Sequence, residues 1–159
     1  MQEQKAVGNA LNRSASPYQA TTKLVNMEEI RGSEKYGKKQ YSDAIYEGEL
    51  VNGKRHGLGV MIYHNSRIYE GGWVDDFRDG KGFERYSNGN TYEGDFAKGK
   101  ADGKGIYTWN NGEVYDGEWK EGLKHGDGIW KGTDGDSYIG EWRISKAEGY
   151  GVHIWKGGK

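Results

Sequence analysis

Pairs of acidic residues recur along the sequence, and paired carboxylates are the groups that general acid–base catalysis uses. The pairs are Glu47 with Glu49, Glu93 with Asp95, and Asp116 with Glu118. A catalytic pair is a singular feature of one cleft, whereas these pairs recur in register along the chain. We therefore interpret them as a solvated face or a docking surface and assign no catalytic residue.

The sequence also predicts neither a metal site nor a phosphate-binding loop. The sequence has four histidines and no cysteine, and His56 and His125 lie 69 residues apart. If these residues belong to stacked strand pairs with neighbouring strands ~4.8 Å apart, about 29 Å separates the two histidines, too far to share an ion. The lysine- and glycine-rich run Lys98–Gly105 lacks the strand–loop–helix context of a phosphate loop. We expect no metal site, no cofactor and no enzymatic activity.

The elements that carry these side chains follow a period of 23 residues, which indicates a stacked-repeat protein. Counting each repeat from a tyrosine at position 0, glycine recurs at positions 2, 11 and 13, an aromatic or leucine at position 4, and an aliphatic residue or phenylalanine at position 14. The leading tyrosines are Tyr46, Tyr69, Tyr92, Tyr115 and Tyr138.

Each repeat is predicted to form a β-hairpin. Positions 0–5 alternate in the manner of a strand, a turn-rich segment follows, and positions 11–17 form a second strand. We expect positions 0, 2 and 4 to pair with 16, 14 and 12. That register places the tyrosine, the position-4 aromatic and the position-14 aliphatic on one face, and the aromatics at 15 and 17 on the other. The fold class is all-β: an elongated, single, twisted antiparallel sheet of stacked hairpins.

These columns resemble the MORN repeat (membrane occupation and recognition nexus), with its YEGEWxxGxxxGxG pattern. Five units begin at residues 46, 69, 92, 115 and 138 within 46–159, and residues 36–45 look like a degenerate half-repeat that caps the first unit. The first and last units drift from the pattern, as Leu50 and Ile139 illustrate. Terminal repeats are expected to do so because they cap the stack.

The N-terminal residues 1–35 show none of this pattern and are predicted to be an extended tail, disordered unless bound. Within it, LVNMEEIRG could form one short helix with Asn26 as N-cap and Gly32 as its stop. The tail is a candidate attachment point for a partner.

Two sets of residues follow from the predicted hairpins. The expected repeat core comprises Tyr46, Tyr69, Tyr92, Tyr115, Tyr138, Phe96, Ile106 and Ile129. The expected partner-binding residues, chosen because large aromatics anchor protein interfaces, are Trp73, Trp109, Trp119, Trp130, Trp142, Trp155 and Ile154. The last two lie on a strand expected at the open edge of the sheet, where unpaired backbone groups invite another chain or a second copy.

The resemblance implies a non-enzymatic scaffold that mediates protein–protein interactions. The chain is similar to the repeat region of ciliary radial spoke head proteins, which implies an intracellular location in a cilium, a flagellar axoneme or the cytoskeleton. Some MORN proteins carry a catalytic domain; since this chain stops within the last repeat, we expect none. The alternative is a phospholipid-binding module. Beyond residue 40 the chain holds 16 Lys and Arg against 20 Asp and Glu, so an anionic membrane or nucleic acid is an unfavourable partner.

Overall fold

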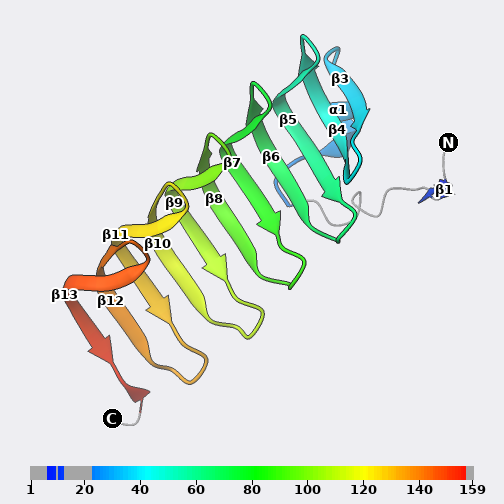
Figure 1. The fold of residues 1–159 in the computed structure, drawn as a ribbon. Helices are drawn as coiled ribbons and strands as arrows, with labels where there is room; N and C mark the ends of the chain where they lie inside the picture. The colour runs from blue at the N-terminus through cyan, green and yellow to red at the C-terminus, as the bar shows by residue number, and fades with distance from the viewer. Residues whose placement is uncertain (1–6, 10, 13–22, 157–159) are drawn as a thin grey trace.

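The computed structural model describes residues 7–9, 11–12 and 23–156, and its main feature is one open antiparallel sheet of eleven strands, β3 to β13, in sequence order (Figure 1). The strands are β3 (Tyr36–Gln40), β4 (Ala44–Val51), β5 (Lys54–Tyr63), β6 (Ile68–Val74), β7 (Phe77–Arg85), β8 (Thr91–Ala97), β9 (Lys100–Thr108), β10 (Val114–Lys120), β11 (Leu123–Lys131), β12 (Ser137–Arg143) and β13 (Lys146–Ile154). Two short strands, β1 (Val7–Asn9) and β2 (Leu11–Asn12), pair with each other. The all-β, single-sheet prediction is confirmed.

Each 23-residue unit is one hairpin, as expected, but the predicted register is wrong by one residue. Tyr46 pairs with Met61 and Gly48 with Gly59, so positions 0 and 2 face positions 15 and 13. A β-bulge follows position 2: between the pairs Gly48–Gly59 and Leu50–Arg55, β4 has one residue and β5 has three, among them Gly57 with a φ of 105°. The one-residue difference from the predicted register moves position 14 to the face opposite the tyrosines, where Val60 pairs with Glu47.

The corrected register divides the side chains into two faces of different character. The aromatic face carries the rings at positions 0, 4, 15 and 17. The aliphatic face carries the acid at position 1 together with the residues at position 14, which are Val60, Phe83, Ile106, Ile129 and Val152. The expectation that the aromatics at positions 15 and 17 lie opposite the tyrosines is therefore wrong, since they share the face of the tyrosines.

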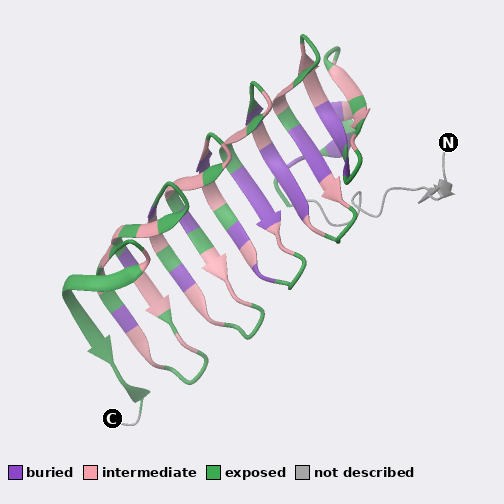
Figure 2. Ribbon diagram, in the orientation of Figure 1, coloured by how far each residue is buried: buried purple, intermediate pink, exposed green. Residues whose placement is uncertain are grey.

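Burial follows this division and corrects two residues of the expected core. The five leading tyrosines and Phe96 are buried, whereas Ile106 is 42% exposed and Ile129 is half-buried. These isoleucines lie on the aliphatic face, and burial decreases toward the C-terminal end of the described sheet (Figure 2).

The segment 23–35 corrects the prediction of an extended tail. The helix α1 (Met27–Arg31) has Asn26 as N-cap and Gly32 as C-cap, as its sequence indicated. Val25, Met27 and Ile30 pack with Val60 and Ile68 on the aliphatic face of the first two repeats. The segment is ordered on the chain's own sheet because apolar burial and buried carboxylates hold it there. The rest of the predicted tail, residues 1–6, 10 and 13–22, lies outside the described residues.

Candidate binding surface

The tyrosines and the position-4 aromatics interlock into one continuous ladder along the aromatic face. Tyr92, for example, makes edge-to-face contacts with Phe96 at 5.1 Å and with Trp119 at 5.3 Å between ring centroids. Edge-to-face geometry at these separations is the favourable arrangement of two aromatic quadrupoles. Trp119 also donates its Nε1–H to the carbonyl of Gly105 at 3.0 Å. The ladder therefore ties each repeat to the next.

Glycines make room for the tyrosine rings. The Tyr115 hydroxyl donates to the carbonyl of Glu118 at 2.9 Å, and a Cβ added at Gly128 would overlap the Tyr115 ring. The same relation holds between Tyr92 and Gly105. Burial raises the pKa of Tyr115 to about 12, so its hydroxyl remains a donor throughout the neutral range.

The expected partner-binding tryptophans separate into three groups. Trp73 and Trp119 are buried in the ladder, so for them the assignment to a free docking surface is wrong. Trp109, Trp130 and Trp142 are half-buried. Trp155 and Ile154 are about half exposed; Ile154 ends the edge strand β13, all of whose residues are exposed.

The bulge also accounts for two of the paired acids. At position 3, the Glu49 carboxylate accepts the backbone N–H of Leu58 at 2.8 Å, and Asp95 accepts that of Lys104 at 3.0 Å. These acids therefore satisfy backbone donors that the bulge removes from the ladder, which corrects their reading as a solvated or docking face.

The position-1 acids on the aliphatic face hold the N-terminal segment. Glu47 accepts two hydrogen bonds from the Arg31 guanidinium and one from the Tyr36 hydroxyl. Burial opposes ionisation of Glu47, but these donors outweigh it and hold the pKa of the carboxyl below its usual value.

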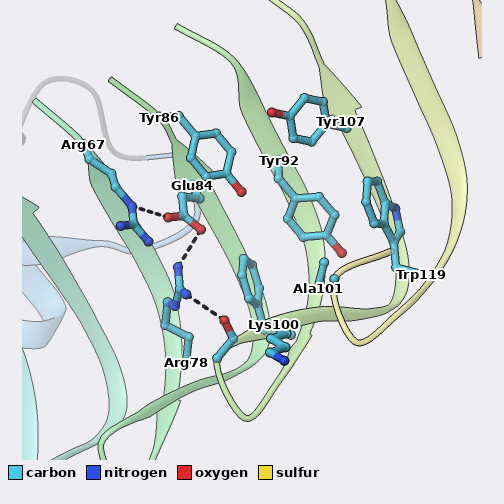
Figure 3. Close-up of a pocket in the computed structure, with 12 residues that line it drawn as sticks. Arg67, Arg78, Glu84, Tyr86, Tyr92, Lys100, Ala101, Tyr107 and Trp119 are labelled. Atoms are coloured by element: carbon cyan, nitrogen blue, oxygen red, sulfur yellow. Dashed lines mark hydrogen bonds and ion pairs between the residues drawn. The ribbon is translucent and has the colours of Figure 1, made fainter. Parts of the chain in front are cut away.

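A half-open hollow of about 210 Å³ lies on the aromatic face at the third repeat (Figure 3). Its aromatic lining is Tyr86, Tyr92, Phe96, Tyr107 and Trp119, and its other lining residues are Arg67, Arg78, Glu84, Gly99, Lys100, Ala101 and Gly122. Large rings around a partly open space provide the anchoring contacts that protein interfaces use.

A buried ionic cluster forms one wall of the hollow. Glu84 is 1% exposed, and each of Arg67 and Arg78 approaches one of its carboxylate oxygens at 2.6 Å. Both guanidinium groups are thereby directed toward Glu84, as Figure 3 shows. The second nitrogen of Arg78 donates to the carbonyl of Gly99 at 2.6 Å.

Sequence reasoning missed a row of cations on this face. They occupy position 9 of their repeats, where Arg55, Arg78 and Lys124 each lie over aromatic rings. Burial lowers the pKa of Lys124. The signal was present in the sequence, because the three residues recur at one position of the 23-residue period.

The described residues form neither a metal site nor a membrane-spanning helix. Among them, no group of three or more His, Asp and Glu side chains is placed to hold a metal ion. In the same part of the chain, no helix has both the length and the apolar character needed to cross a membrane.

Comparison with known proteins gives one family. The family model of the MORN repeat matches five consecutive segments, at residues 46–66, 69–91, 92–114, 115–137 and 138–159. The comparison with curated proteins finds no match.

Proposed function

The chain belongs to the MORN-repeat family, whose repeats suggest a protein-interaction or membrane-binding module, and on that premise we propose that it is a non-enzymatic scaffold that binds another protein through its aromatic face. The observation that carries the proposal is the hollow at the third repeat, where half-buried Tyr86 and Tyr107 line a space that opens to solvent. The Tyr86 and Tyr107 rings stack on each other, with 5.9 Å between their centroids. Rings fixed in this way offer contact area at little further entropic cost.

Membrane binding is the second candidate, and the contacts of the basic residues argue against it. Arg55 belongs to the basic cluster Lys54–His56, but its side chain pairs with Asp76 at 2.9 Å and lies over Tyr41 and Trp73. Arg67 and Arg78 are both engaged by Glu84. These cations are not arranged as a free polybasic surface, which anionic lipids require.

A location in a cilium, an axoneme or the cytoskeleton is part of the proposal and rests on the resemblance to radial spoke head proteins. The partner would then be a subunit of a larger assembly, a second MORN protein or a second copy of this chain. The exposed edge strand β13 offers a further attachment site, since all of its residues are exposed.

Site-specific photocrosslinking tests the proposal. A photoreactive phenylalanine analogue replaces Tyr107 on the aromatic face in one variant and Ile129 on the aliphatic face in the other, both being half-buried in the wild type. We expect a discrete protein adduct, formed in cells, at position 107 and a weaker one or none at position 129. Crosslinking at 129 alone would move recognition to the other face.

Flotation with liposomes, with and without phosphoinositides, separates the two candidates. The protein is expected to remain in the unbound fraction with both kinds of vesicle. Flotation that depends on phosphoinositide, together with no adduct at position 107, would replace the scaffold proposal with the membrane one.

A further inference from the structure

The cation row on the aromatic face is interrupted at the third repeat. Position 9 is occupied by Arg55, Arg78, Ala101, Lys124 and Ala147 in the five successive repeats. Ala147 lies in the last repeat and has no following repeat among the described residues. Ala101 is different, because complete repeats flank it on both sides, and the hollow of about 210 Å³ lies beside its methyl group.

The neighbouring repeats show what position 9 normally holds. The Lys124 ammonium lies 5.2 Å from the Trp109 ring centroid, 5.6 Å from that of Tyr115 and 5.4 Å from that of Trp142. One repeat earlier, the equivalent rings are Tyr86, Tyr92 and Trp119, and all three line the hollow. The three rings that surround Lys124 in the fourth repeat therefore have equivalents in the third repeat, where position 9 provides no cation.

A carbonyl completes the arrangement where the cation is arginine. Arg55 donates its Nη2–H to the carbonyl of Asp76 at 3.0 Å, and Arg78 donates to that of Gly99 at 2.6 Å. In each case the acceptor follows 21 residues after the arginine, and its own N–H donates back to the arginine carbonyl. The residue that stands 21 after Ala101 is Gly122, whose N–H donates to the Ala101 carbonyl at 2.8 Å and which lines the hollow.

From these relations we propose that the hollow beside Ala101 receives the guanidinium group of an arginine supplied by the partner protein. The incoming group lies over Tyr86, Tyr92 and Trp119 and donates to the Gly122 carbonyl, as Arg78 does to Gly99. Arginine fits better than lysine because its planar group stacks on rings and donates in two directions at once. The inference rests on the protein-interaction role and names the side chain recognised there.

The lining holds three cations, Arg67, Arg78 and Lys100, against the one carboxylate of Glu84, so an added cation is held by the rings and a carbonyl and not by charge attraction. Arg67 and Arg78 both direct their guanidinium groups to Glu84, which leaves Lys100 as the cation of the lining without a carboxylate contact among the described ion pairs. Lys100 is exposed, so solvent screens its repulsion. Removing the Lys100 charge is nevertheless expected to raise the affinity for the incoming guanidinium. This change tests whether Lys100 repels the bound cation.

The direct experiment is an NMR titration that follows the Ala101 methyl group in the otherwise unchanged full chain. The probes are N-acetyl-arginine amide, the neutral isostere N-acetyl-citrulline amide and the anion N-acetyl-glutamate amide. We expect saturable shifts with arginine and a citrulline affinity about two- to thirtyfold lower, the factor that a cation–π contribution of ~0.5–2 kcal/mol implies. Equal affinity for citrulline, or preferential binding of glutamate, would overturn the proposal.

Two variants sharpen the result. Lys100→Gln is expected to tighten arginine binding, and weaker binding would contradict the charge assignment. Ala101→Arg places the guanidinium in the hollow from within, so it is expected to abolish the titration and raise the thermal midpoint by about 2–4 °C for each kcal/mol gained. Ala101→Leu, which adds volume without charge, is the matched control and is expected to block binding without that gain. An Ala101→Arg variant that still binds arginine amide as the wild type does would count against the site.

The outcome is separable from that of the scaffold proposal. Adducts at position 107 without arginine binding would leave the protein-interaction role in place and remove the arginine pocket. Arginine binding without a photocrosslinked adduct at position 107 would overturn the proposal that a partner protein supplies the arginine.

Discussion

Glu70 and Leu24 are joined by a hydrogen bond that fixes the N-terminal segment to the sheet: the Glu70 Oε1 accepts the Leu24 backbone N–H at 2.6 Å. The same oxygen accepts from Lys23 at 2.7 Å and from Val25 at 3.2 Å. Glu70 is only 2% exposed, so its carboxylate is solvated by the segment in place of water. One carboxylate thus determines where residues 23–25 lie.

Replacing Glu70 with Ala is expected to release this segment. Backbone donors that lose a buried acceptor cost about 1–3 kcal/mol. We expect hydrogen exchange at residues 23–25 to accelerate strongly while β8 to β11 keep their protection. Glu93→Ala is the control, since the Glu93–Lys23 ion pair is exposed and such pairs contribute about 0–1 kcal/mol. Equal acceleration in both variants would show that Glu70 does not anchor the segment.

Phe96 and Ile106 provide a test of the two faces. Phe96 is 5% exposed and belongs to the ring ladder, so Phe96→Ala is expected to cost about 3–5 kcal/mol of unfolding free energy. Ile106 is 42% exposed on the aliphatic face, and Ile106→Ala is expected to cost less than about 1.5 kcal/mol. Urea denaturation measures both. A larger loss for Ile106 would mean that the third repeat buries its aliphatic face instead.

The ladder also predicts a stabilising change. Trp73, Trp119 and Trp142 donate their indole N–H to a glycine carbonyl 14 residues earlier, whereas Phe96 cannot. In Phe96→Trp the equivalent acceptor is Gly82. One added hydrogen bond contributes about 0.5–1.5 kcal/mol, so the thermal midpoint is expected to rise. Phe96→Leu, which lacks both ring and donor, is the control and is expected to lower it. A decrease with tryptophan would show that the site is already filled.

Gly105 is required because the Tyr92 ring lies across it. In Gly105→Ala the new Cβ would overlap the ring, and overpacking of this kind costs about 1–3 kcal/mol. Gly32→Ala is the matched control, since its Cβ meets only ordinary contacts at the C-cap of α1 and its φ of −85° suits alanine. Thermal denaturation compares the two. Similar losses at both sites would remove the ring–glycine contact from the explanation.

Stability is expected to fall at acid pH partly through Glu47. Its pKa is lower in the folded protein than in the unfolded chain, so the unfolded state binds the proton more readily. The contribution is fully present above the unfolded pKa and is lost as the pH falls through the folded one. Urea denaturation of wild type and Glu47→Gln between pH 7 and pH 3 measures it. The difference in stability between the two proteins is expected to shrink toward low pH, and a constant difference would exclude this linkage.

The repeat and much of its hairpin can be read from the amino-acid sequence alone. Tyrosine and glycine recur every 23 residues because each unit meets its neighbour through the same contacts, and strand alternation is a local property that adjacent residues reveal. The helix α1 was readable for the same reason, since Asn26 and Gly32 act on backbone groups only a few residues away.

The face that each residue occupies follows from the three-dimensional pairing of the strands and not from the local sequence. The bulge at Gly57 and its equivalents depends on a positive φ, which glycine permits but does not require, and a register one residue from the predicted one places Ile106 on the aliphatic face. The position of residues 23–31 was equally beyond sequence pattern, because it depends on Glu47 and Glu70 far along the chain. The hollow beside Ala101 is a further case. The alternation of arginine, alanine and lysine at one position can be read from the sequence, but stacking of consecutive hairpins is what places three rings around the alanine.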